Sequence, residues 1–337
     1  MSEQAGPSPV LFFESINAYQ KTAALRAAIE MDLFTAIGEA GRTAGELAAR
    51  CEASARGTRI LCDYLVVAGF LTKTGSEYGL TQDSAAFLDR RSPAYLGGAT
   101  EFLLSPTLTG AFEDLASVVR TGTTPLGGEG TVEPDHPVWV KFARAMMPIM
   151  ALPAREMVRR IPLPTDRELR ILDIAAGHGL FGIAFGREYP SAEVTALDWP
   201  AVLEVAKENV SKAGLENRFH TIEGDAFEAG LDGPYDMVLL TNFLHHFDAR
   251  TCEKLLRRVH GALAEDGRAV TLEFVPNEDR VSPPGSAVFA LTMLATTGNG
   301  DAYTFAEYDA MFRAAGFSHS ELVELQPGME RVVVSRR

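Results

Sequence analysis

The chain has 337 residues, of which 46% are hydrophobic and 23% are charged, a composition typical of a globular protein with enough core for two domains. Its formal net charge of -14 argues against a surface built to bind nucleic acid or an anionic membrane, because such surfaces gather Lys and Arg. The charge balance therefore favours a small molecule as the main partner.

Cysteine usage and the N-terminal residues indicate the compartment. Cys51, Cys62 and Cys252 have no metal-type spacing and leave one cysteine unpaired in any disulfide scheme, which favours a reducing compartment. The opening MSEQAGPSPV is not typical of a signal peptide, and no apolar run of about 18 residues appears elsewhere. We therefore expect a cytoplasmic protein that does not enter a membrane.

Residues 1–100 show helical spacing of apolar side chains, followed by a hairpin pattern. Thr43 lies three residues before Glu46, which predicts a capping box at the start of a short helix. A further helix is predicted through residues 60–67, and FLTKTGSEYGLT alternates around Gly75 as a hairpin does. Helix, helix and hairpin in this order predict a mainly helical, winged-helix-like domain.

A winged helix either binds DNA or serves as a dimerisation domain. The helix that would read DNA offers only Arg56 and Arg59 before it becomes apolar, so we expect no nucleic acid partner. A non-catalytic regulator that senses a ligand stays the alternative from another functional class. The first helices carry more apolar side chains than one short domain buries, which predicts a homodimer. Those side chains are Phe12, Phe13, Ile16, Ala24, Leu25, Ile29 and Leu33.

Residues 101–164 are less regular and are rich in Phe, Leu and Met. Within them, helical spacing places Phe142, Met146 and Ile149 on one apolar face. Such a face either joins the core or, because Met adapts to irregular ligand shapes, forms the wall of a pocket. We predict a helical linker and substrate lid here, and the pattern leaves both possibilities open.

Residues 165–337 alternate between strands and helices. Strands separated by single helices pack as a parallel sheet with helices on both faces, so we predict an α/β domain with a Rossmann-like sheet. The last two strands lie close together in the sequence and predict an antiparallel edge. The predicted strands are ELRILDIAA, AEVTALD, FHTIEG, YDMVLLTN, RAVTLEFV, ELVEL and RVVVS.

The loop after the first of these strands is DIAAGHGLFG, in which Gly177 and Gly179 free the backbone to turn tightly beside a helix N-terminus. Three acids, Asp173, Asp198 and Asp225, fall at successive strand ends. Asp198 stands where a carboxylate can accept hydrogen bonds from ribose hydroxyls. Alternatively, these aspartates are only turn residues or helix caps. That alternative fits any one of them but fits all three together poorly.

Three acids without a Lys or Arg in the loop would repel a pyrophosphate. The ligand is therefore predicted to be a nucleoside that carries positive charge. S-adenosylmethionine meets this description through its sulfonium and amino groups, whereas NAD carries two phosphates. Each hydrogen bond to an ionised acid contributes about 1.5 to 3 kcal/mol.

Five segments together resemble a known family: DIAAGHG, ALDWP, EGDAFE, NFLHHFDARTCEKLLRRVHGALAEDGRAVTLEF and TFAEYDAMFRAAGF. They are similar to the S-adenosylmethionine-dependent methyltransferases that include plant caffeate-type, acetylserotonin and bacterial polyketide-tailoring O-methyltransferases. The resemblance covers nearly the whole chain, including a winged-helix-like dimerisation domain. It implies methylation of a small, largely apolar, aromatic or polyketide-like acceptor, with S-adenosylhomocysteine as product. O-methylation is the leading interpretation, and C- or N-methylation by the same fold stays open.

The resemblance also implies roles for residues near the cofactor. Asp198 matches the acid that binds ribose and Asp225 the acid that contacts adenine. The family's loop has three glycines where this chain has Ala175, Ala176 and Gly177, and we expect cofactor binding to survive the added methyl groups. The complete predicted cofactor set is Asp173, Ala175, Gly177, Asp198, Trp199, Asp225, Ala226, Phe227 and Thr241.

LHHF matches the family's LHDW, which implies that His245 is the catalytic base and that His246 replaces an aspartate. Glu273 matches the acid that orients the base. Histidine suits removal of a hydroxyl proton near neutral pH, and a carboxylate at its other ring nitrogen fixes the tautomer. A metal site of two histidines and one carboxylate is a weaker alternative, because adjacent side chains would have to converge on one ion. We expect no bound metal.

A second acid of the family also faces the histidine, but the matching position here is Ala302, with Asp301 beside it. We therefore expect a weaker base at His245 than in relatives that methylate phenols. The residues predicted to contact the acceptor are Phe142, Met146, His246, Met293 and Asp301.

Overall fold

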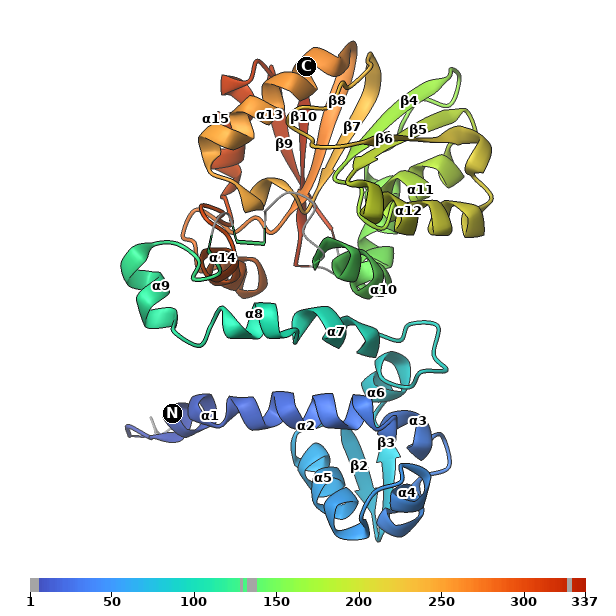
Figure 1. The fold of residues 1–337 in the computed structure, drawn as a ribbon, viewed down its shortest axis with the longest axis vertical. Helices are drawn as coiled ribbons and strands as arrows, with labels where there is room; N and C mark the ends of the chain where they lie inside the picture. The colour runs from blue at the N-terminus through green and yellow to red at the C-terminus, as the bar shows by residue number, and fades with distance from the viewer. Residues whose placement is uncertain (1–5, 128–129, 132–137, 326–328) are drawn as a thin grey trace, which may run out of the picture. The chain divides into compact units, whose positions relative to one another are not determined.

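The computed structural model describes residues 6–127, 130–131, 138–325 and 329–337. The chain forms two compact units, Met1–Thr100 and Glu101–Arg337 (Figure 1). Whether residues 101–164 form a part separate from residues 165–337, as the sequence predicts, stays a prediction.

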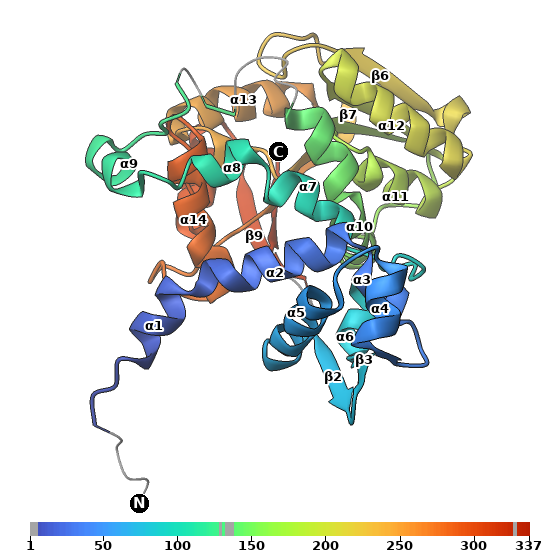
Figure 2. The same ribbon diagram turned by 60° about the horizontal axis from the view of Figure 1, so that its bottom comes forward.

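The first unit is mainly helical (Figure 2). It carries one small antiparallel sheet with the strand order β1-β3-β2. Its elements are α1 Val10–Ile16, α2 Ala18–Glu30, α3 Leu33–Ile37, β1 Arg42–Thr43, α4 Ala44–Arg50, α5 Ala55–Val67, β2 Leu71–Thr74, β3 Glu77–Leu80, α6 Gln82–Phe87 and the 3-10 turn η1 Gly97–Ala99. The hairpin β2–β3 turns at Gly75, which has a φ of +59°, so the predicted hairpin is confirmed.

Local signals in the sequence set the helix ends of this unit. The side chain of Thr43 accepts from the backbone N–H of Glu46 while the Glu46 carboxylate accepts from Thr43, which completes the predicted capping box of α4. In α5, Arg59 forms an ion pair with Asp63. Of the two arginines in this helix that could contact DNA, Arg59 is therefore already paired with an acid.

Helix α1 differs from the rest of the unit because none of its residues is buried. Its large apolar side chains are 55% to 75% exposed, although helices α2 to α5 pack around a compact core. The exposed side chains of α1 are Val10, Leu11, Phe12, Phe13 and Ile16.

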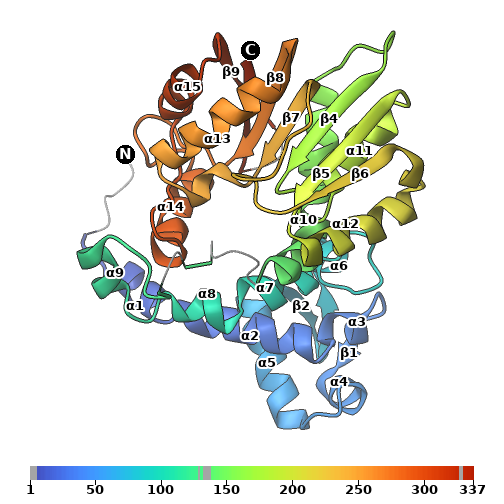
Figure 3. The ribbon, with the colours of Figure 1, turned by 45° about the horizontal axis from the view of Figure 1, so that its top comes forward.

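The second unit is a seven-stranded mixed sheet with helices on both faces (Figures 1 and 3). Its strands are β4 Leu169–Ile174, β5 Ala192–Asp198, β6 Phe219–Glu223, β7 Tyr235–Thr241, β8 Leu263–Glu273, β9 His319–Glu324 and β10 Arg331–Arg336. Its helices and 3-10 turns are α7 Thr100–Leu103, α8 Pro106–Gly110, α9 Leu115–Thr121, α10 Val138–Arg160, α11 Leu180–Glu188, α12 Pro200–Ala213, η2 Glu216–Arg218, η3 Leu244–His246, α13 Ala249–Ala262, α14 Pro284–Thr296 and α15 Phe305–Ala314.

The strand order β6-β5-β4-β7-β8-β10-β9 confirms the predicted Rossmann-like sheet and its antiparallel edge. Strands β4 to β8 are parallel, whereas β10 is antiparallel to both β8 and β9. One hydrophobic core joins α10, α11 and α12 to one face, and a second joins α13 and α15 to the other (Figure 3). Parallel strands covered on both faces explain the nearly continuous aliphatic runs in the sequence.

This topology gathers the polar residues of several strands at one edge of the sheet. Asp198, Thr241 and Glu273 are the last residues of β5, β7 and β8, so all three lie at the carboxyl edge of the parallel strands. Because β10 runs the opposite way and Arg331 pairs with Glu273, the residue before β10 also lies at this edge. Open α/β sheets bind their ligands there. In the part of the chain that the structure describes, no helix is long and apolar enough to cross a membrane.

Candidate active site

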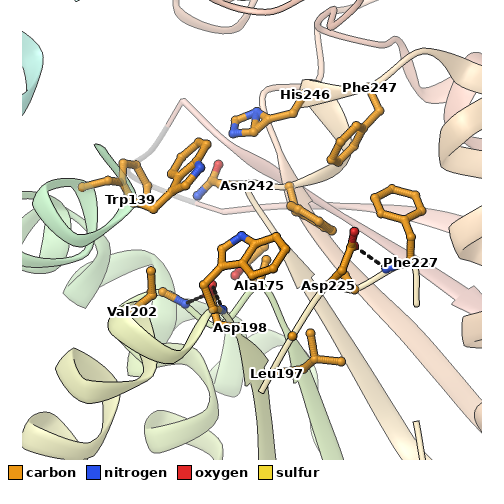
Figure 4. Close-up of a pocket in the computed structure, with 17 residues that line it drawn as sticks. Trp139, Ala175, Leu197, Asp198, Val202, Asp225, Phe227, Asn242, His246 and Phe247 are labelled. Atoms are coloured by element: carbon orange, nitrogen blue, oxygen red, sulfur yellow. Dashed lines mark hydrogen bonds between the residues drawn. The ribbon is translucent and has the colours of Figure 1, made fainter. Parts of the chain in front are cut away.

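An open pocket lies over the carboxyl ends of β4, β5 and β7, with a volume of about 860 Å³ that includes the solvent space at its mouth (Figure 4). Side chains from the glycine loop, the strand ends and α10 surround it. Its lining residues are Trp139, Phe142, Ala175, Gly177, Leu197, Asp198, Trp199, Val202, Gly224, Asp225, Ala226, Phe227, Thr241, Asn242, Phe243, His246 and Phe247. Eight of the nine residues predicted for the cofactor are among them, and Asp173 is not.

The loop between β4 and α11 has an unusual backbone. Ala175, Gly177 and Gly179 have φ values of +54°, +57° and +73°, a left-handed region that glycine adopts freely and alanine does not. Gly179 is also crowded, because an added Cβ would lie 3.1 Å from the Cβ of Ala206. Ala175 is therefore the strained member of the loop, where the resembling family has glycine.

Two of the three predicted acids face the pocket. Asp198 accepts hydrogen bonds from the backbone N–H groups of Gly177 at 2.8 Å and Trp199 at 2.7 Å, one on each oxygen. Each oxygen keeps a lone pair for a ligand hydroxyl. Burial raises the pKa of Asp198 to about 6. Asp225 accepts from the backbone N–H of Phe227 at 2.8 Å (Figure 4).

The third acid, Asp173, lies beneath the loop. It is fully buried, and one of its oxygens accepts from the backbone N–H of Gly182 in α11 at 3.0 Å. Burial, with a smaller contribution from Asp198, raises the pKa of Asp173 to about 7. Asp173 therefore ties β4 to α11 and does not line the pocket.

Aromatic rings form much of the remaining wall. Trp139 and Phe142 come from α10, Trp199 precedes α12, and three phenylalanines lie opposite. Phe227, Phe243 and Phe247 contact one another edge to face or tilted, with centroids 5.0 to 6.4 Å apart. No Lys or Arg belongs to the lining that the structure describes. Acids and aromatic faces both favour a cationic, planar ligand over a pyrophosphate.

The chain leaves β7 through a sharp turn that carries the two histidines. Asn242 has a φ of +53°, and the 3-10 turn η3 follows. One oxygen of Glu273 accepts from the backbone N–H groups of Phe243 at 3.0 Å and Leu244 at 2.8 Å. The other oxygen accepts from Nδ1 of His245. Glu273 thus receives three hydrogen bonds from this single turn.

His245 is held from several sides. It is 3% exposed, and its ring meets Phe289 of α14 edge to face at 4.8 Å. Its carbonyl oxygen accepts from the backbone N–H of Asp301 at 3.0 Å. Because Nδ1 donates to Glu273, Nε2 is left as the ring atom that can accept a proton.

His246, in contrast, lines the pocket directly. Its ring stacks on Trp139 with centroids 5.0 Å apart and lies 4.2 Å from the ring of His245. Burial, followed by the charge of His245, lowers the pKa of His246 well below its usual value. Its Nδ1 is buried and has no hydrogen-bond partner among the residues that the structure describes. The ring is therefore neutral and offers an unused polar atom.

The residues predicted for the acceptor divide into two groups. Phe142 and His246 line the pocket, whereas Met146 packs against the core together with Ile149. Met293 is buried in α14. The carboxylate of Asp301 accepts from the N–H of Ala302 and lies 3.6 Å from Arg280, and Asp301 is not among the lining residues.

Several residues that line the pocket were not predicted from the sequence. Trp139 is three residues before Phe142, so the same helical spacing could have shown it on that face. Asn242, Phe243 and Phe247 flank the histidines, but nothing in the sequence indicates which way their side chains turn. No cluster of three or more His, Cys, Asp or Glu side chains suited to a metal ion occurs within the described ranges.

Two family models match the chain. A model described as an O-methyltransferase domain matches residues 112–318, more than half of the chain. A model described as an O-methyltransferase dimerisation domain matches residues 13–90.

Individual relatives agree with these matches. The chain is 29% identical to 3-hydroxy-5-methyl-1-naphthoate 3-O-methyltransferase of Streptomyces sahachiroi, covering 96% of this chain and 94% of that protein. It is 28% identical to acetylserotonin O-methyltransferase of Mus musculus, covering 91% and 83%. A solved structure from Nostoc punctiforme PCC 73102 with a provisional O-methyltransferase assignment is 53% identical, with a TM-score of 0.94 over 98% of this chain and 100% of that one. Human N-acetylserotonin methyltransferase in complex with SAM is 23% identical and shares the fold, with a TM-score of 0.86 over 100% and 99%.

The strain at Ala175 makes a stability prediction. Ala175→Gly should raise the free energy of unfolding by about 0.5 to 1 kcal/mol, because relief of about 1 to 2 kcal/mol of left-handed strain exceeds the added entropy of the unfolded chain. Ala176→Gly is the matched control, since Ala176 is buried without a positive φ, and it should lose about 1 kcal/mol. Urea unfolding monitors both, and a loss of stability in Ala175→Gly would contradict the assignment of strain.

The buried carboxyl of Asp173 makes a prediction about pH. Because its pKa is raised to about 7, the folded chain keeps a proton that the unfolded chain releases near pH 4. Its effect on the unfolding free energy is therefore favourable at low pH and is lost as pH rises toward 7. Asp173→Asn should be more stable than the parent protein by about 2 to 4 kcal/mol at pH 8, and the difference should vanish near pH 4. Denaturant unfolding across this range checks it, with exposed Asp266→Asn as control; parallel pH curves for parent and Asp173→Asn would refute it.

Proposed function

Because the chain belongs to the O-methyltransferase family, whose members use S-adenosylmethionine, we propose that it methylates a hydroxyl oxygen of a small, largely apolar and planar acceptor. The observation that carries this proposal is the pairing of His245 with Glu273 directly beside an aromatic pocket. Methylation of oxygen requires a proton acceptor, and this pair supplies one.

The residues of the pocket suit S-adenosylmethionine. Asp198 would hold the ribose hydroxyls with its free lone pairs, and Asp225 would contact the adenine beside Ala226 and Phe227. The left-handed loop at Ala175 would present the backbone to the amino acid end of the cofactor. When bound, the cofactor supplies a methyl group that its sulfonium has already activated for displacement.

His245 has the role of general base in this proposal. Its Nδ1 donates to Glu273, so Nε2 takes the hydroxyl proton of the acceptor. Glu273 keeps the ring in one orientation and stabilises the positive charge that forms on it. Beyond proton transfer, the protein has to align the acceptor oxygen with the methyl group of the cofactor, because displacement on an activated methyl group requires the reactants in line.

The acceptor is proposed to be planar and aromatic. Phe274 and Phe289 stack at 3.9 Å beside His245, and Phe142 and Trp139 face the pocket from α10. Residues 101–164, which supply α10, would act as the lid over the acceptor. The names of the relatives from Streptomyces sahachiroi and mouse also denote O-methylation of aromatic compounds.

Substitutions at the histidine turn test this assignment. His245→Ala should lower the rate of methyl transfer by about 10² to 10⁴, the range for loss of a general base. Glu273→Gln should fall between this variant and the parent protein, because the imidazole stays but is poorly oriented. His246→Ala should retain most of the activity. Mass spectrometry of the methylated product, after a screen of phenols, indoles and 2-oxo acids, provides the rates.

Two further observations complete this experiment. His220→Ala is the matched control, since His220 is exposed on β6 and pairs with Glu193 away from the pocket. Full activity in His245→Ala would show that the acceptor needs no base, as for a carbon or nitrogen nucleophile. Equal losses in the His245 and His246 variants, reversed by a divalent metal, would instead favour a metal site.

We infer that the protein is a homodimer through its N-terminal unit. The dimerisation model spans residues 13–90, and α1 leaves five large apolar side chains exposed in the single chain. Contiguous apolar surface of this kind is usually covered in soluble proteins.

Light scattering tests the dimer. The parent protein should give about twice the 36.4 kDa of one chain, and Phe13→Glu should reduce this mass toward that of a monomer. Val67→Glu is the control, because Val67 is 88% exposed on α5 of the same unit, outside α1. A mass of one chain for the parent protein at micromolar concentration would overturn the inference.

A further inference from the structure

A buried carboxyl group at the carboxyl edge of the sheet has no role in the site as described so far. Glu330 directly precedes β10, and the next residue, Arg331, pairs with Glu273 at the end of β8. Antiparallel pairing therefore brings Glu330 to the strand end that carries the partner of His245. The nearest signal in the sequence is only a single acid before RVVVS.

The side chain of Glu330 is buried and contacts the turn that follows β7. Its side chain is 6% exposed, and one carboxylate oxygen lies 3.5 Å from Nδ2 of Asn242. Asn242 follows β7 directly and lines the pocket, and its amide also lies 3.5 Å from the sulfur of Met150 in α10. Asn242 thus links Glu330 to the lining of the pocket and to α10.

No ion pair of the Glu330 carboxyl group is seen among the residues that the structure describes. The pKa of Glu330 is raised to about 7, mainly by burial and to a smaller extent by the charge of Glu273, while the Asn242 amide and the charge of His245 act in the opposite direction. Arg331, the adjacent cation, is turned away and donates to the carbonyl of Val275 at 3.0 Å. That guanidinium also pairs with the exposed carboxylate of Glu324 at 3.0 Å. A positive charge on His245, when the ring takes up a proton, would favour the ionised form of Glu330.

We propose that Glu330, held by Asn242, is a positioning residue that stabilises the protonated form of His245 through space. This inference rests on the proposed function and deepens it. When Nε2 of His245 takes the acceptor's proton, Glu273 balances the new charge through its hydrogen bond and Glu330 adds a second negative charge nearby. Ala302 contributes no carboxyl group, and Glu330 would contribute one from the residue directly before β10.

Linkage between the two groups makes the proposal measurable. If a carboxylate at residue 330 stabilises the imidazolium, protonation of His245 must favour ionisation of Glu330 by the same free energy. Removal of either charge therefore shifts the titration of the other. A purely structural carboxyl would change stability without moving either titration.

The test is the titration of His245 in the full-length protein. The ¹⁵N-imidazole signal of His245, assigned by its loss in His245→Gln, is followed against pH in the parent protein and in Glu330→Gln. The midpoint should fall by about 0.5 to 1 pH unit in Glu330→Gln, because a nearby charge changes a titration by about this amount. Glu324→Gln removes a carboxylate from the same hairpin but outside the site, and it should leave the midpoint unchanged.

A reciprocal measurement covers the case in which Glu330→Gln does not fold. The ¹³C-carboxyl titration of Glu330 should move to higher pH in His245→Gln, which removes the cation that favours its ionised form. Unmoved midpoints in both experiments would overturn the proposal. Neither experiment uses an acceptor, so a failure here is distinct from the absence of methyl transfer, which would refute the proposed function alone. Where an acceptor is identified, the acid limb of kcat/KM should shift to lower pH in Glu330→Gln, and a uniform loss at all pH values would count against the proposal.

Discussion

The carboxylate of Glu273 is the constraint on which the rest of the site depends. Its three hydrogen bonds join the end of β8 to the turn after β7, and two of them satisfy backbone N–H groups that would otherwise each cost about 1 to 3 kcal/mol to bury. The same carboxylate fixes the tautomer of His245. With the His245 ring held against Glu273, the second histidine of the turn, His246, lines the pocket and stacks on Trp139.

The surrounding fold separates binding from proton transfer. The acids that suit a nucleoside, Asp198 and Asp225, lie at the carboxyl ends of β5 and β6, whereas the histidine turn and Glu273 lie at the carboxyl ends of β7 and β8. The aromatic wall lies beside both halves. Burial raises the pKa of Asp198 to about 6, because a buried carboxylate is costly to ionise, and a ligand with positive charge or hydroxyl donors would offset that cost.

Much of this arrangement follows from the sequence because strand ends in a parallel sheet converge. Alternating strands and helices predicted the sheet, and acids after the strands predicted Asp198 and Asp225 in one pocket. Asp173 obeys the same pattern but is buried under the glycine loop, since a strand-end position does not fix the direction of a side chain. Glu330 could not be found without the register of β10 against β8, which is a long-range property of the fold. The positive φ of Ala175 could likewise not be predicted, because the residue type alone does not fix the backbone conformation.

The central claim is that the pocket binds S-adenosylmethionine through acids and without a cation for phosphate. Calorimetric titration with S-adenosylhomocysteine tests it most directly, with NAD as the matched nucleotide. We expect one S-adenosylhomocysteine per chain with a Kd between micromolar and sub-millimolar, no heat from NAD, and a loss of affinity of about tenfold or more in Asp198→Asn, which weakens hydrogen bonds to an ionised acid. Absence of heat with S-adenosylhomocysteine, or tighter binding of NAD, would contradict the account.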